Sequence, residues 1–155
     1  MDKKSAKRRR WSLMRLYAHR YERHYSSRPG CFYCGEPHST IDHCPPITFC
    51  EVKDEKWFKE KNIRFYIVAC CSECNTKLSN KPFLTLHERA GHILSWLEKK
   101  SNEVVIWTED EINEMSSVFA KSIIARKKQH QMLIDRVRFC QELLYRRDDF
   151  PEEVE

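Results

Sequence analysis

The chain has 155 residues, a formal net charge of +5, and 33% charged residues. Only 3 glycines occur, where average usage would give roughly 11, which argues against a glycine-rich β-barrel, a phosphate-binding P-loop and a dinucleotide-binding fingerprint. The longest apolar run, residues 65–71, is far shorter than the ~20 residues that cross a bilayer, and no apolar signal-peptide core follows the basic N-terminus. We therefore expect a cytoplasmic, mostly helical protein that does not bind membranes.

The positive charge is concentrated at the N-terminus. Residues 1–28 hold ten Lys or Arg and two acidic side chains, a net charge of +8, so the rest of the chain sums to −3. Such a segment attracts a polyanion, most simply DNA. Because Trp11, Met14, Ala18 and Tyr21 recur at helical spacing, we expect a helix that partly docks on the protein rather than a solvated tail. The side chains expected to contact nucleic acid are Lys7, Arg8, Arg9, Arg10, Arg15 and, further along, Lys77.

The middle of the chain combines short strands with turn signals. Residues 26–30 (SSRPG) predict a break after the first helix. Residues 39–43 (STIDH) predict a short strand that the following prolines end. Residues 47–62 are interpreted as a long polar connection, and residues 63–69 (IRFYIVA) predict a second strand.

The second half of the chain is predicted to be helical. Residues 83–100 place apolar side chains on one helical face. A capping box begins at Thr108, and apolar residues then recur at steps of three and four, interrupted by Arg126 and His130. This predicts one long helix, or two that join between residues 122 and 130. Its apolar seam is expected to pack on the zinc domain, with a homodimer or a partner protein as the alternative.

The cysteines predict a metal site. Eight occur, and four of them form two C-x-x-C pairs: Cys31, Cys34, Cys71 and Cys74. In an intracellular protein this pattern indicates a structural zinc rather than disulfides. Cys70 could replace Cys71 as a metal ligand only by changing the spacing of the second pair to C-x3-C. A zinc would bring together the strand that carries His43 and the helix start that carries Asn75.

The dipeptide Asp42-His43, together with Asn75, suits phosphodiester hydrolysis. A neutral imidazole can accept a proton from water. A carboxylate and an amide oxygen suit Mg²⁺ or Mn²⁺, which would stabilise the developing charge. The alternative is that these side chains only cap or fill space in a zinc-stapled domain.

The segments CFYCG, IDHCPP and ACCSECNTKLS together resemble the HNH endonucleases, the ββα-metal or His-Me finger superfamily, and in particular its four-cysteine zinc branch. The resemblance covers about 50 of the 155 residues. It implies a ββα core, His43 as general base, and Asp42 and Asn75 as ligands of the catalytic Mg²⁺ or Mn²⁺. It also implies DNA cleavage without a nucleotide cofactor.

One position departs from the family pattern. The family has an Asn that orients the base nine residues before Asn75, and this chain has Tyr66 there. The Tyr66 hydroxyl could orient His43, or Asn62 could do so if the long connection folds back. The departure favours a second hypothesis, a non-catalytic zinc module that binds nucleic acid or protein and derives from an HNH nuclease.

These segments define the expected organisation of the chain. Its four parts are a basic helical arm (1–28), the zinc HNH core (29–82), a helical extension (83–147) and an acidic tail (148–155). The expected fold class is α+β and mostly helical, with a zinc-stapled ββα core, a basic N-terminal helix and long C-terminal helices.

Overall fold

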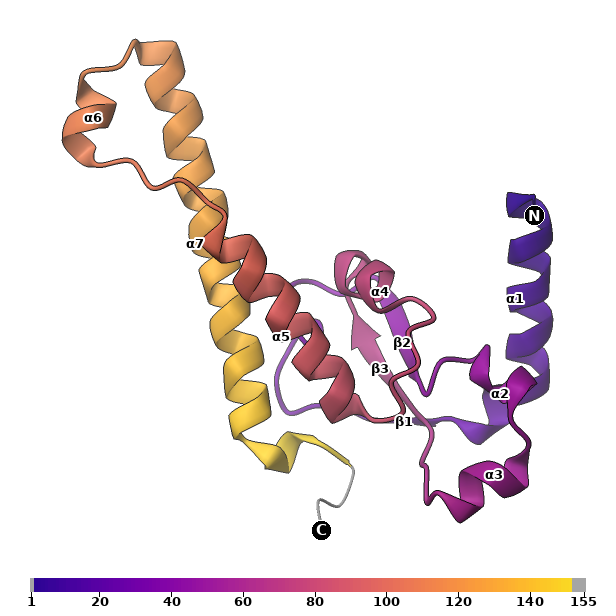
Figure 1. The fold of residues 1–155 in the computed structure, drawn as a ribbon. Helices are drawn as coiled ribbons and strands as arrows, with labels where there is room; N and C mark the ends of the chain where they lie inside the picture. Colours follow the sequence, from indigo (N-terminus) through magenta and orange to yellow (C-terminus); the bar gives the residue numbers. More distant parts are fainter. Residues whose placement is uncertain (1, 152–155) are drawn as a thin grey trace.

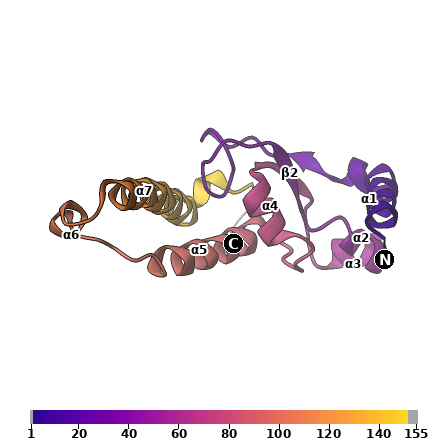
Figure 2. The same cartoon turned by 90° about the horizontal axis from the view of Figure 1, so that it is seen from above.

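The computed structural model describes residues 2–151 and has an elongated α+β fold (Figures 1 and 2). Its helices are α1 (Lys3–Tyr17), α2 (Phe49–Val52), α3 (Glu55–Glu60), α4 (Ser72–Leu78), α5 (Leu86–Asn102), α6 (Glu109–Asn113) and α7 (Ser117–Tyr145), with 3-10 turns η1 (Ala18–Arg20) and η2 (Arg147–Asp149). Its strands are β1 (Glu22–Arg23), β2 (Thr40–Cys44) and β3 (Tyr66–Cys70). Part of the predicted acidic tail, residues 152–155, lies outside the described residues. Among residues 2–151, no helix combines the length and the apolar character needed to span a bilayer.

The sheet has the strand order β1-β3-β2. The two predicted strands are confirmed as β2 and β3, which pair antiparallel with Asp42 opposite Val68 and His43 opposite Ile67. The two-residue strand β1 pairs parallel to β3 and was not predicted, because so short a segment has no alternating pattern. Helix α4 follows β3 after a single residue, so the chain order at this point is strand, strand, helix.

The basic N-terminal segment forms a helix, but its predicted docking face is wrong. Helix α1 ends at Tyr17, so Ala18 and Tyr21 do not continue its face. Leu13 is the buried residue of α1, whereas Trp11 is 60% exposed. Tyr21 instead lies in extended backbone and donates a hydrogen bond from its hydroxyl to the Pro45 carbonyl oxygen at 2.6 Å. The helix is therefore anchored by one apolar side chain and leaves most of its surface exposed.

The connection between β2 and β3 is more structured than predicted. It contains α2 and α3, and the Asp54 carboxylate caps α3 by accepting a hydrogen bond from the Trp57 backbone N–H at 2.8 Å. Phe58 is buried, and its ring packs against Trp57 and Phe65. These aromatic contacts form a small cluster beside the sheet. The sequence did not indicate this cluster, because most residues of the segment are polar.

Helices α5 and α7 cross and pack together in the part of the core that they share (Figure 1). The capping box at Thr108 is confirmed, with reciprocal hydrogen bonds to Glu111. The predicted join at residues 122–130 is wrong, because the break falls at residues 114–116 and α7 runs without interruption to Tyr145. The seam of α7 packs on α5 as well as on the expected four-cysteine segment, because Leu133 and Cys140 belong to one buried core with residues of both.

Candidate metal centre and surrounding site

Four cysteine sulfurs form a compact buried cluster. The members are Cys31, Cys34, Cys71 and Cys74, whose Sγ atoms all lie within 4.8 Å of one another. A tetrahedral zinc with Zn–S bonds of about 2.3 Å separates its sulfurs by roughly 3.8 Å, and the Cys34 and Cys71 sulfurs are 3.7 Å apart. The cluster is therefore compatible with a structural metal such as zinc. It is made by the two predicted pairs, and Cys70 is not part of it.

Local backbone structure shapes both cysteine pairs. Cys71 is the N-cap of α4, and its sulfur accepts a hydrogen bond from the Cys74 backbone N–H at 3.4 Å. In the first pair, the Gly35 N–H donates to the Cys31 carbonyl oxygen at 2.9 Å. Gly35 has a φ of 78°, and a Cβ there would lie 2.5 Å from the Phe139 ring. Only glycine satisfies both conditions, so Gly35 fits the tight turn beneath the cluster.

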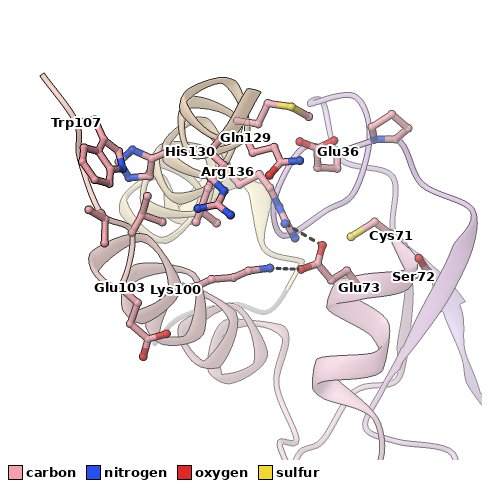
Figure 3. A pocket seen from close by; sticks show the side chains of 16 residues that line it. Glu36, Cys71, Ser72, Glu73, Lys100, Glu103, Trp107, Gln129, His130 and Arg136 are labelled. Atoms are coloured by element: carbon pink, nitrogen blue, oxygen red, sulfur yellow. Dashed lines mark hydrogen bonds and ion pairs between the residues drawn. The ribbon is translucent and has the colours of Figure 1, made fainter. Parts of the chain in front are cut away.

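A buried arginine lies against the cysteine cluster. Arg136 of α7 is 8% exposed, and its guanidinium donates to the Cys74 sulfur at 3.7 Å and to the Glu73 carboxylate at 3.0 Å. Lys100 contacts the same carboxylate at 2.8 Å, beside Cys71 (Figure 3). Four thiolates around a divalent ion carry a net charge of −2, which a buried cation offsets. The setting of Arg136 thus fits a metal-thiolate cluster better than four neutral thiols.

The two polar residues that interrupt the α7 seam face a cavity rather than the core. Arg126 and His130 line a hollow of about 800 Å³ between α7, the α5–α6 connection and the start of α4. Trp107 lies beside His130 in this hollow (Figure 3). The break in the apolar pattern therefore marks the place where α7 separates from α5.

His43 lies on β2 beside the N-terminal segment. The Tyr21 ring meets the His43 ring edge-on, with centroids 4.9 Å apart. Burial lowers the pKa of His43 from its ordinary value of 6.5; Asp42 acts in the opposite direction, and the charges of Arg10 and Arg89 lower it further. The imidazole is therefore neutral at neutral pH, which is the form that can accept a proton.

Asp42 faces the opposite side of β2 from His43, as successive residues of a strand do. It is 3% exposed, and its carboxylate accepts hydrogen bonds from the Arg89 guanidinium at 2.6 and 2.7 Å and from the Tyr33 hydroxyl at 2.6 Å. Burial, together with the Asp42 charge, raises the pKa of Tyr33 well above its usual value, so its hydroxyl stays protonated and donates. The structure thus commits Asp42 to a buried ion pair that joins β2 to α5.

Asn75 joins α4 to β2. Its amide nitrogen donates to the Thr40 hydroxyl at 3.1 Å and to the Ile41 carbonyl oxygen at 3.2 Å. Both bonds use the nitrogen and neither uses the amide oxygen. The residue thus lies against the strand that carries His43, as the sequence predicted.

The structure does not bring Tyr66 to His43. Tyr66 pairs with Cys44 in the sheet, on the buried face that Asp42 shares, and its hydroxyl donates to the Pro151 carbonyl oxygen at 3.4 Å. Asn62 lies after α3 with a φ of 53°, and its N–H donates to the Lys59 carbonyl oxygen. Tyr21, which the sequence did not single out for this role, is the aromatic residue that contacts the base candidate.

The basic residues of α1 lie on two sides of the helix. Arg9 pairs with Glu51 of α2 at 2.6 Å, which ties the helix to the body. A cleft of about 450 Å³ separates α1 from the segments that follow β2 and α4, and it is lined by Lys7, Arg9, Arg10, Leu13, Thr48, Ser79 and Asn80, with Ala6. A second hollow on α1 itself is lined by Lys4, Lys7, Arg8, Trp11, Ser12 and Arg15. Lys77 lies over the Trp96 ring, 5.7 Å from its centroid.

Comparison with known proteins gave no match. No family model, no curated protein and no solved structure matches this chain.

Two residues that the sequence analysis passed over prove important for the site. Arg89 and Arg136 each stand among apolar positions of a predicted helix, three residues after Leu86 and Leu133 respectively. A charged residue at a core-facing position is rare unless it is paired. That anomaly was the available signal for both buried cations.

Proposed function

We propose that this chain is a metal-dependent endonuclease of the HNH type that hydrolyses phosphodiester bonds in DNA, with a structural zinc in the four-cysteine cluster. The observation that carries the proposal is the order of two antiparallel strands, β2 and β3, followed by helix α4. One cysteine pair precedes β2 and the other begins α4, and all four sulfurs lie close together. Across this unit, Asn75 is hydrogen-bonded to the strand that carries His43.

His43 is the general base in this proposal. Its lowered pKa keeps the imidazole neutral, so it can take a proton from the water that attacks phosphorus. Arg10 contributes a positive charge near His43, and together with Lys7 it lines the cleft beside α1, where both can contact phosphate oxygens.

Asp42 and Asn75 are the proposed ligands of Mg²⁺ or Mn²⁺. A bound divalent ion would stabilise the charge that develops on the phosphate and the leaving oxygen. Both hydrogen bonds of the Asn75 side chain are donated by its amide nitrogen, and neither uses its amide oxygen. This supports the assignment of that oxygen as a ligand of the ion. Asp42 must exchange a hydrogen bond from Arg89 for the ion, because Arg89 contacts both of its oxygens. Its carboxylate must also turn toward the face of β2 that carries His43, since the two side chains lie on opposite faces of the strand.

A second candidate function is a non-catalytic zinc module that binds nucleic acid. The hydrogen bonds of Asp42 with Arg89 and Tyr33 favour this function, because a carboxylate that already accepts three short hydrogen bonds is poorly placed to bind a metal ion. The position of Tyr66 away from His43 also favours it. Such a module would bind DNA through α1 and leave it intact.

Replacing His43 with alanine separates the two functions. We expect purified wild-type protein with Mg²⁺ or Mn²⁺ to nick or linearise plasmid, and His43→Ala to lose at least about 100-fold in rate, the usual contribution of a general base. Zinc content and DNA affinity should not change, because the base acts on water. The control is His38→Ala, which removes an exposed histidine. Equal cleavage by wild type and His43→Ala, or no cleavage by either, would refute the catalytic proposal.

The pH dependence of the cleavage rate is a second test of His43 as the general base. Since His43 must be neutral to act, the rate should rise with pH and reach half its plateau below pH 6.5, because burial lowers the His43 pKa. A divalent ion on Asp42 would repel the imidazolium and shift the midpoint in the same direction. A midpoint well above pH 6.5 would show that another group limits the rate.

The exposed cations of α1 are expected to supply backbone affinity. The variant Lys4→Gln, Lys7→Gln, Arg8→Gln should weaken DNA binding and make the salt dependence shallower by about 0.9 for each phosphate that the helix no longer neutralises. Fluorescence anisotropy at several salt concentrations measures both effects. The control Lys99→Gln, Arg138→Gln, Arg146→Gln removes the same charge from exposed positions on α5, on α7 and at the end of α7. If the α1 variant and the control show the same dependence of DNA affinity on salt concentration, α1 does not contact DNA.

A further inference from the structure

The end of the molecule that lies farthest from α1 in Figure 1 holds more than half of the large hydrophobic side chains that are exposed in residues 2–151. We call residues 104–132 the arm tip; it comprises the α5–α6 connection, α6 and the first half of α7. Six of the eleven large hydrophobic side chains exposed in the described part of the chain lie there: Val105, Ile106, Val118, Phe119, Ile124 and Met132. Exposed apolar surface gathered at one place indicates an interaction site rather than the scatter normal for a monomer.

The arm tip has little core of its own. Ile112 and Ile123 are its buried apolar residues before Leu133, and the Trp107 and Phe119 rings meet edge-on at 6.4 Å. Helix α6 has only five residues, and the first half of α7 extends beyond the end of α5, which packs on the second half (Figure 1). A tip of this size gains stability if another surface covers its apolar side chains.

The outward face of α7 in the arm tip has a regular pattern. Val118, Ala125 and Met132 recur every seven residues, and Lys121 and Lys128 stand between them at the same interval. All five side chains are exposed. Because positions three, four and seven residues apart share a helix face, these residues form one stripe that alternates apolar and basic side chains.

The arm tip carries opposite charges side by side. Residues 109–114 contain four acidic side chains and no basic one, a net charge of −4, and residues 121–128 contain four basic side chains and no acidic one, a net charge of +4. Of the ion pairs formed within residues 2–151, none uses any of these eight side chains. The carboxylate of Glu111 is held by Thr108 in the capping box, and the other seven side chains are available to a partner.

We propose that the arm tip binds the arm tip of a second copy of this chain. A two-fold axis near Val118 and Phe119 places the acidic α6 of each copy against the basic stretch 121–128 of the other, so both contacts are attractive. The apolar residues between the charge blocks are then covered on both copies. A surface that carries equal and opposite charge blocks is complementary to itself, which favours a second copy over a partner of one charge sign.

Charge reversal tests this pairing on the full-length protein. Wild type is expected to be dimeric in sedimentation equilibrium at micromolar concentration. The acid-reversed variant Glu109→Lys, Glu114→Lys and the base-reversed variant Lys121→Glu, Lys128→Glu should each associate on the order of 100-fold more weakly, because four surface charge pairs become repulsive at once. Mixed in equal amounts, the two variants should form a heterodimer, because every pair across that interface is attractive again.

The control is Lys56→Glu, Lys61→Glu, which changes the same charge at exposed positions in and just after α3 and should leave the dimer intact. Circular dichroism checks that every variant keeps its helices. A monomeric wild type at ~100 µM overturns the proposal. A mixture that associates no better than its components also overturns it, because the charge blocks would then not face each other.

Discussion

Replacing Cys31 or Cys74 by serine is expected to release the proposed structural zinc and to unfold the centre of the protein. The four sulfurs lie within 4.8 Å of one another and join the segment before β2 to the start of α4. Structural zinc contributes roughly 10 kcal/mol or more of apparent binding energy to small domains. That is comparable to the whole stability of a typical domain, about 5–15 kcal/mol, so its loss should not be tolerated.

Elemental analysis and thermal unfolding measure this effect. Wild type should contain one zinc per chain, and both variants should lose it together with their cooperative transition. The matched controls are Cys50→Ser and Cys140→Ser, which change buried cysteines outside the cluster. Cys140 donates to the Ala90 carbonyl oxygen, a bond that a serine hydroxyl can also make. Folded wild type without metal, or Cys31→Ser with full zinc content, would contradict a structural zinc.

The local elements of the core were predictable because their signals are short-range. β-branched residues and the prolines that follow them predicted β2, and a continuous β-branched and aromatic run predicted β3. The capping box predicted the start of α6 from the four consecutive residues 108–111. The two C-x-x-C pairs predicted which of the cysteines meet, since the spacing of a metal knuckle depends only on local chain geometry.

What the sequence did not reveal depends on contacts between distant segments. Arg89 lies 47 residues from Asp42, and no local pattern relates the two. The end of α1 at Tyr17 depends on the following segment pairing with β3, because nothing in the helix itself stops it. The single helix α7 passes through the polar residues Arg126 and His130 because they face a cavity, which the periodicity could not distinguish from a break.

The pairing of Asp42 with Arg89 gives the second large expected effect. Asp42→Ala should lower the free energy of unfolding by about 3–5 kcal/mol, because it leaves a fully buried guanidinium without its carboxylate. Tyr33 loses its hydrogen-bond acceptor in the same variant. A loss of nuclease activity in Asp42→Ala would therefore not by itself identify Asp42 as a metal ligand, since the strand that carries His43 is destabilised as well.

Urea unfolding of a double-mutant cycle measures the pair. Arg89→Met alone should also destabilise strongly, because it leaves a buried carboxylate unpaired. The double variant Asp42→Leu, Arg89→Met should lose clearly less than the sum of the single losses, because a buried ion pair can be replaced by apolar side chains at little net cost. The exposed pair Lys59–Glu55 is the control, and Lys59→Ala should change stability by no more than about 1 kcal/mol. If Asp42→Ala has the same free energy of unfolding as wild type, the ion pair does not hold β2 to α5. The Asp42 carboxylate of the wild-type protein could then leave Arg89 and bind the metal ion.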